Sequence, residues 1–165
     1  MPARINSSHW LQTAPDFSSD AVTLPARAEI AILGAGVMAS ALAYWLARRG
    51  QSPLAVERNP IPSAGATGRS GGLHATGPNH AYATAIERFG RASAREIFAA
   101  TILNQQLLED VLAREAIDAD YAVTGFLSLA ARADEVETLR ASARELSADG
   151  FPAEGLDRDA AGGFE

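Results

Sequence analysis

The sequence predicts an α/β fold, in which a parallel β-α-β unit is followed by a long helical segment and the start of a second sheet. Three observations support this prediction. An apolar run at residues 30–33 is followed at once by a glycine turn and a helix-forming segment. A second apolar run, at residues 54–56, follows a basic helix end and Gly50. Beyond residue 79 the apolar residues recur at helical spacing.

The first strand and the turn after it indicate a binding site. Residues 30–33 are apolar without a break, as expected for a parallel strand covered on both faces. Gly34 permits a sharp turn, and Gly36 leaves room for a phosphate group beside the free amides of a helix start. A helix follows from Val37 and ends in a basic turn before Gly50. This order is typical of a Rossmann-like dinucleotide site, although an ordinary β-α-β turn without a ligand has the same elements.

The turn has the spacing GxGxxA, with Ala39 where a third glycine is more usual. Alanine adds only a methyl group, which the helix-to-strand packing at this position tolerates. The second strand ends at Glu57, 21 residues after Gly36, where a carboxylate can accept hydrogen bonds from the ribose hydroxyls of adenosine. Because a carboxylate would repel a 2′-phosphate, FAD or NAD is favoured over NADP, and Arg58 next to it weakens that preference only a little.

Composition excludes several classes of protein. The chain has 165 residues, 47% of them apolar and 21% charged, which suits one globular core. A net charge of −6 argues against a nucleic-acid surface. Without cysteine there is no disulfide, thiolate zinc site or cysteinyl cofactor link, and the three histidines are too dispersed for a metal motif. No secretory signal and no apolar stretch of membrane-spanning length is evident, so we expect a cytoplasmic chain without a membrane span.

A second glycine-rich segment, ATGRSGG at residues 66–72, follows the β-α-β unit. Its glycines let the backbone approach a flat or phosphorylated ligand, and it also offers two hydroxyls and a guanidinium fork. On residues alone a mobile surface loop is an equally good explanation. The candidate ligand contacts of this segment are Thr67, Gly68, Arg69, Ser70, Gly71 and Gly72.

Together, GAGVMA, Glu57 and the loop GATGRSGG resemble the FAD-dependent oxidoreductases of the D-amino-acid oxidase superfamily. The branch that contains gamma-glutamylputrescine oxidase, glycine oxidase and sarcosine oxidase-like enzymes is the most similar. In that family the second loop reads close to GASGRNGG, so Thr67 replaces serine and Ser70 replaces asparagine. The segment His9 to Leu11 also resembles the S-x-W-L approach of the putrescine-oxidase-like branch, although Trp10 could equally anchor a tail on the core.

The resemblance implies FAD as the cofactor and an amine or amino acid as the small-molecule substrate. The reaction it implies is oxidation of a C–N bond by hydride transfer to flavin, which gives an imine that hydrolyses. By the same analogy, the pyrophosphate is met by Gly34, Gly36 and Ala39, and the adenosine end by Glu57 and Arg58. The loop from Thr67 to Gly72 runs toward the flavin ring, with Leu73 nearest to the ring.

The rest of the chain predicts two helical regions and a strand. Beyond Asn79 the pattern is helical, and Thr84 with Glu87 could form a capping box. The expected buried face of this region comprises Ile86, Phe89, Ser93, Ile97, Thr101, Leu108, Val111 and Leu112. Residues 121–131 alternate as a strand does, and they resemble the first strand of the family's substrate-domain sheet. Residues 134–148 predict another helix, with Val136, Leu139, Ala143 and Leu146 buried.

We therefore expect an N-terminal extension at residues 1–27, an FAD-binding portion at 28–118 and an incomplete start of a substrate domain at 119–165. Family members are commonly more than twice this length, so the resemblance implies an N-terminal fragment with little turnover alone. A second chain could supply the missing part. No catalytic residue and no metal ligand is assigned. Two other functions stay open, a NAD-dependent reductase and a non-catalytic adenine-dinucleotide-binding module.

Overall fold

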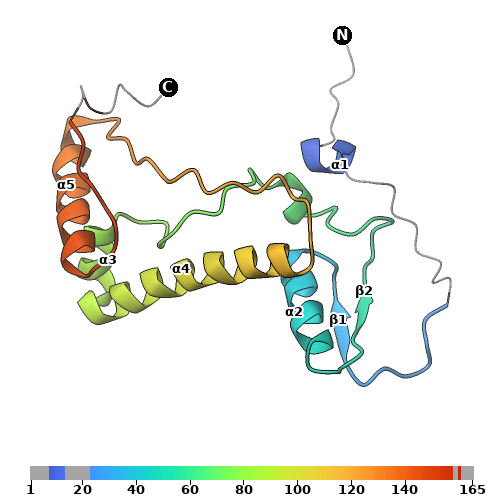
Figure 1. Cartoon of the computed structure of the whole chain (residues 1–165). Coiled ribbons are helices and arrows are strands. Elements are labelled where there is room, and N and C mark those ends of the chain that lie inside the picture. The colour runs from blue at the N-terminus through green and yellow to red at the C-terminus, as the bar shows by residue number, and fades with distance from the viewer. Residues whose placement is uncertain (1–7, 14–22, 158–159, 161–165) are drawn as a thin grey trace, which may run out of the picture. The chain divides into compact units, whose positions relative to one another are not determined.

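A computed structural model describes residues 8–13, 23–157 and 160 of the chain. Within these residues the chain forms helices and a two-stranded parallel sheet, which confirms the predicted α/β class in its general form (Figure 1). The chain divides into two compact units, residues 1–73 and 74–165. The assignment of 28–118 and 119–165 to an FAD-binding portion and a substrate domain stays a prediction.

The first unit contains the predicted β-α-β element. Strands β1 (Ala31–Leu33) and β2 (Leu54–Val56) pair in parallel, with Ala31 opposite Leu54. Helix α2 (Val37–Ala47) makes the crossover that a parallel pair requires. The side chain of Ile32 is buried between these elements, at 7% exposure. The predicted start of the helix and the bounds of the second strand are confirmed, and the first strand is one residue shorter than expected.

Two short elements complete the first unit. Helix α1 (His9–Thr13) begins after Ser8, whose Oγ accepts a hydrogen bond of 3.2 Å from the Leu11 amide. The 3₁₀ turn η1 (Thr67–Arg69) lies in the second glycine-rich segment, and α1 packs against it. Helix α1 and the second loop are therefore neighbours in the folded unit.

The second unit contains α3 (Tyr82–Phe89), α4 (Arg91–Arg114) and α5 (Ala133–Ala148). Ala85 and Ala94 are fully buried, and their small side chains allow close packing around Tyr82. The rings of Tyr82, Phe98 and Phe151 surround this point, with Phe98 and Phe151 4.6 Å apart and Tyr82 edge-on to both. An aromatic cluster over two alanines thus forms the centre of the second unit.

Half of the predicted helical face beyond Asn79 is wrong. Gly90, with a φ of +79°, separates α3 from α4 and changes the rotational phase of the helix that follows. Four of the expected buried positions are exposed: Phe89, Ser93, Ile97 and Leu108. The capping box of Thr84 with Glu87 is also wrong, because α3 already begins at Tyr82. The residue that caps α3 is instead Ser142 of α5, whose Oγ accepts a hydrogen bond of 3.0 Å from the Ala83 amide.

The predicted strand at residues 121–131 is wrong too, since residues 117–130 form neither helix nor strand. A strand needs a neighbour for its backbone N–H and C=O groups, and no described segment pairs with this one. By contrast, the helix expected at 134–148 is confirmed as α5, which ends before Gly150. Its expected face is only half-buried, and the fully buried residue on it is Ser142, at 6% exposure.

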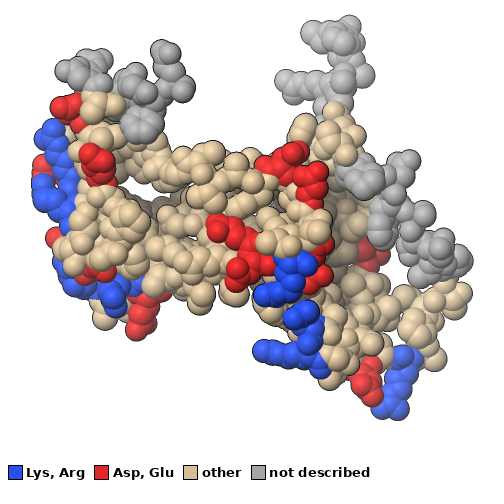
Figure 2. Space-filling model, in the orientation of Figure 1, with Lys and Arg blue, Asp and Glu red and all other residues tan. Residues whose placement is uncertain are grey.

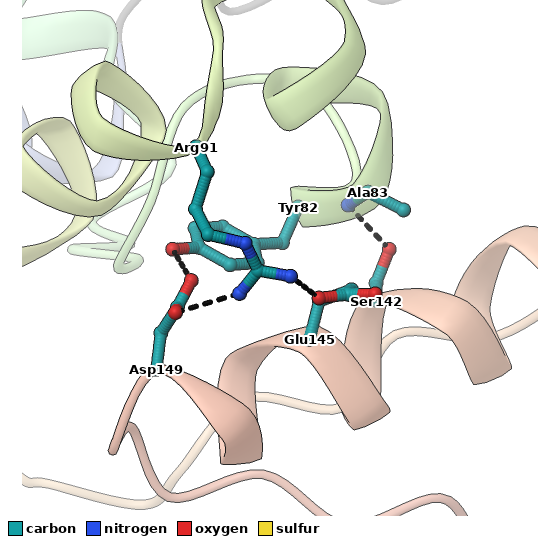
Figure 3. A network of polar contacts seen from close by, with 6 residues as sticks. All are labelled: Tyr82, Ala83, Arg91, Ser142, Glu145 and Asp149. Atoms are coloured by element: carbon teal, nitrogen blue, oxygen red, sulfur yellow. Dashed lines mark hydrogen bonds and ion pairs between the residues drawn. The ribbon is translucent and has the colours of Figure 1, made fainter.

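A polar network holds the end of α5 against the starts of α3 and α4 (Figure 3). The Arg91 guanidinium donates to Asp149 Oδ1 at 2.7 Å and also contacts the Glu145 carboxylate. The Tyr82 hydroxyl donates to the second oxygen of Asp149 at 2.8 Å. Because Arg91 is half-exposed, its ion pairs contribute little to stability. The buried Tyr82 hydroxyl, at 3% residue exposure, is the contact that matters most.

Burial, together with the hydrogen bond to Asp149, raises the pKa of Tyr82 to about 12. A raised pKa stabilises the fold below the unfolded pKa of 10.0, and this contribution is lost as the pH rises through about 12. Tyr82→Phe should therefore cost about 1 kcal/mol at neutral pH, from the lost hydrogen bond. It should also remove the tyrosine-linked loss of stability between pH 10 and about 12.

Thermal unfolding followed by circular dichroism across this pH range tests the prediction. Tyr44→Phe in the first unit is the matched control and should leave the alkaline profile of the second unit as in the parent chain. An equal alkaline loss in Tyr82→Phe and in the parent chain would contradict the prediction.

Candidate dinucleotide-binding site

The glycine turn joins the carboxyl end of β1 to the start of α2. Gly34 has a φ of +98°, a conformation that strains any side chain, and its amide donates to the Val56 carbonyl at 2.8 Å. Gly36 has an ordinary φ of −89°, but a Cβ there would lie 3.0 Å from Thr67 Oγ1. The first glycine is thus required by the turn itself, and the second by the close approach of the later loop.

Ala35, between the two glycines, is held from both sides. Its amide donates to Glu57 Oε2 at 2.9 Å. Its carbonyl accepts from the amide of Ser63 at 3.0 Å and from the Ser63 hydroxyl at 3.2 Å. Ser63 adopts a φ of 60°, which costs a non-glycine residue free energy and is offset by these contacts. Sequence analysis missed Ser63, because a residue that binds a backbone carbonyl leaves no pattern of residue types.

The start of α2 is capped from a distant part of the chain. Its N-cap residue, Gly36, has no side chain, and the Oγ1 of Thr67 accepts a hydrogen bond of 3.0 Å from the Val37 amide instead. The next amides of the first turn, those of Met38 and Ala39, have no acceptor within an α-helix. These amides and the positive end of the helix dipole favour an anion at this point.

Glu57 lies at the end of β2 and is already ordered by the protein. Its Oε1 accepts from the Asn59 amide at 2.8 Å and from Asn59 Nδ2 at 2.6 Å. The hydrogen bonds from Asn59, and then that from Ala35, lower the pKa of the Glu57 carboxyl, which is therefore ionised at neutral pH. An ionised carboxylate has about four acceptor positions, and the protein fills three of those of Glu57, so a position remains for a ribose hydroxyl. Asn59 is a further site residue that sequence analysis missed.

The second loop is braced by its own backbone and by α1. Arg69 turns back and donates from Nη1 to the carbonyls of Ala64 and Gly65, so its fork anchors the loop. The Ser70 carbonyl accepts from Trp10 Nε1 at 2.7 Å. Gly68 is buried, and a Cβ there would collide with the Ser63 carbonyl.

Gly71 is the glycine of this loop that is best explained by the close approach of a bound ligand. Its φ is not in the left-handed region, and a Cβ at this position would meet no described atom within 4 Å. Neither conformation nor internal packing therefore requires a glycine there, whereas the close approach of a ligand would. The following Gly72 does have a positive φ, of +74°, and Leu73 is 86% exposed.

The structure thus brings Gly34, Gly36, Glu57 and Thr67 together around one turn. Ala39 lies half-buried in the first turn of α2, while Arg58 and Leu73 are exposed. Helix-start amides for an anion and an ionised carboxylate for hydroxyls fit the adenosine diphosphate part of a dinucleotide. The contacts of the individual residues with a cofactor stay a prediction.

A hollow of about 570 Å³ lies at the opposite end of the two strands, lined by residues that include 27–30 and 50–54. It adjoins the amino ends of β1 and β2. Ligands of open parallel sheets bind outside the carboxyl ends of the strands, so the glycine turn is the better candidate site.

Comparison with known families agrees with this geometry. A family model described as FAD dependent oxidoreductase matches residues 29–164, which include the turn, Glu57 and the second loop. The chain belongs to this family. The resemblance to the D-amino-acid oxidase superfamily is thereby confirmed, and FAD is the cofactor that the family binds. No curated protein and no solved structure matches the chain.

Three further findings concern the surface, the helices and the potential metal ligands of this FAD-dependent oxidoreductase family member. On the face drawn in Figure 2, arginine side chains lie among aspartate and glutamate side chains. Among the helices that the structure describes, none is long and apolar enough to cross a bilayer. Across residues 8–13, 23–157 and 160, no three His, Asp or Glu side chains come together as a metal site.

Removal of the Thr67 hydroxyl should uncap α2. Thr67→Val keeps the shape of the side chain but cannot accept the Val37 hydrogen bond, so the first unit should lose about 1 kcal/mol of stability. Hydrogen exchange at the Val37 amide should accelerate as well. Thr67→Ser retains the hydroxyl and is the matched control. Unchanged exchange at Val37 in Thr67→Val would contradict the capping assignment.

Proposed function

We propose that this chain binds the adenosine diphosphate half of FAD at the glycine turn of the first unit, as part of an oxidoreductase that oxidises a C–N bond of an amine or amino acid. The observation that carries the proposal is the hydrogen bond from the Val37 amide to Thr67 Oγ1, at 3.0 Å. It joins the second loop to the start of α2, where an anion is favoured. Family membership supports FAD as the ligand.

Each part of the site has a defined task in this proposal. The amides of Met38 and Ala39 in the first turn of α2 bind the pyrophosphate, and the Glu57 carboxylate accepts a hydrogen bond from the adenosine ribose. The charge of Glu57 disfavours a 2′-phosphate. Residues Thr67 to Gly72 follow the pyrophosphate and the ribityl chain. When bound, FAD supplies the hydride acceptor for the oxidation of the substrate carbon.

We further propose that the chain has little turnover unless more protein encloses the flavin end of the site. Leu73, which follows the second loop, is 86% exposed. On the same unit, Leu33 is 87% exposed and Met38 is 81% exposed. These exposed apolar side chains are available to a covering protein, and a second chain is one source of that cover. An open flavin end would leave an amine substrate unoriented and in water.

Calorimetric titration of the purified chain with FAD, ADP and NADH tests the cofactor assignment. We expect FAD and ADP to bind and NADH to bind more weakly. Glu57→Gln should weaken FAD binding about tenfold, which is the effect of one charge-assisted hydrogen bond. The matched control is Glu87→Gln, an exposed change on α3 that should leave the affinity unchanged.

The possible results separate the three functions. Binding of NADH without FAD would replace this proposal with a NAD-dependent reductase. Binding of ADP without FAD would favour a non-catalytic adenine-nucleotide module. For the loaded chain, anaerobic addition of amines should bleach the flavin absorbance only slowly, and bleaching at ordinary enzyme rates would contradict the proposed lack of turnover.

A further inference from the structure

Helix α1 places two consecutive side chains on the second glycine-rich loop. Trp10 donates from Nε1 to the Ser70 carbonyl at 2.7 Å. Its six-membered ring lies against Gly72, where a Cβ would be 2.7 Å from Cζ2. Leu11 lies against Gly68, where a Cβ would be 3.1 Å from Cδ2. The two side chains therefore contact both ends of the segment 68–72.

The Trp10 side chain contacts this loop and does not fill a hydrophobic core. The residue is 43% exposed, and no residue of α1 is buried. Its aromatic neighbour among the described residues is His9, which is edge-on at 5.3 Å and belongs to the same helix. A tryptophan used only to fill a core would bury its ring.

Helix α1 and the loop depend on each other for order. A helix of five residues is not stable in isolation, so the contacts of Trp10 and Leu11 with the loop hold α1 in place. In turn, the loop after Thr67 has few other attachments. Arg69 binds carbonyls of the same loop, and the Ser70 hydroxyl accepts from the Gly72 amide at 3.2 Å. Within the part of the chain that the structure describes, Trp10 is the contact that ties Ser70 and Gly72 to a different segment.

We infer that Trp10 is a positioning residue for the cofactor, which holds the Ser70–Gly72 half of the loop in its binding conformation. This inference rests on the proposed function. Thr67 attaches the first half of the loop to the start of α2, where the pyrophosphate binds in that proposal. Trp10 attaches the second half, which faces the part of FAD beyond the pyrophosphate. Loss of Trp10 should therefore affect FAD more than ADP, which ends at the pyrophosphate.

Paired titrations with FAD and ADP test this difference on the full chain. Trp10→Ala should raise the dissociation constant for FAD about tenfold and that for ADP less than about threefold, since a disordered loop must be ordered on binding. Trp10→Phe keeps the ring on Gly72 and loses only the hydrogen bond to Ser70. It should have an intermediate effect, about threefold on FAD.

Trp45→Ala is the matched control. Trp45 is in the same unit, is similarly exposed at 39%, and contacts the ring of Tyr44 on α2. This variant should change the two dissociation constants by similar small factors. A general loss of stability would weaken FAD and ADP together, so the ratio of the two affinities separates a positioning effect from a structural one.

Hydrogen exchange of the ligand-free chain provides a readout that does not need FAD. Trp10→Ala should accelerate exchange at residues 68–72 and leave α2 unchanged, whereas Trp45→Ala should leave residues 68–72 unchanged. If the parent chain binds no FAD, the proposed function fails, and this exchange arm still tests the contact. Parent-like exchange at 68–72, or an unchanged ratio of FAD to ADP affinity in Trp10→Ala, would overturn the inference.

Discussion

The first unit depends on one constraint, which is that the backbone groups of the glycine turn are bound by the chain that follows β2. Glu57 binds the Ala35 amide, Ser63 binds the Ala35 carbonyl and Thr67 binds the Val37 amide. The turn and the second loop therefore fold as one structural element, although they are about 30 residues apart in the sequence. The same contacts that satisfy the turn also set the carboxylate and the helix start at fixed positions, so the fold itself prepares the site.

Both units use the same solution for a helix that lacks a local cap. Helix α2 is capped by Thr67 and α3 by Ser142, whose partner amides are 30 and 59 residues away. Each hydroxyl thereby satisfies a backbone amide at the start of a helix through a tertiary contact. In the first unit this contact lies at the amino end of α2, where the helix dipole favours an anion, whereas in the second unit it is part of the packing of α3 on α5.

The sequence predicted those parts that are determined by short-range residue patterns. The strand, glycine turn and helix of residues 31–47, the second strand and α5 were predicted closely, because apolar periodicity and glycine are local signals. The strand at 121–131 was wrong because strands depend on a partner, and part of the expected face of α4 was wrong because Gly90 changed the rotational phase of that helix. The cofactor class came from two motifs, but Ser63 and Asn59 could not be found, since their partners are defined only in the folded chain.

The central claim is that the glycine turn, held by the second loop, binds the diphosphate of the cofactor. A crystal structure of the chain with bound ADP tests it most directly. We expect the diphosphate to lie within hydrogen-bonding distance of the Met38 and Ala39 amides of α2 and Glu57 to contact a ribose hydroxyl. Binding of ADP in the hollow lined by residues 27–30 and 50–54 instead would show that the glycine turn is not the diphosphate site.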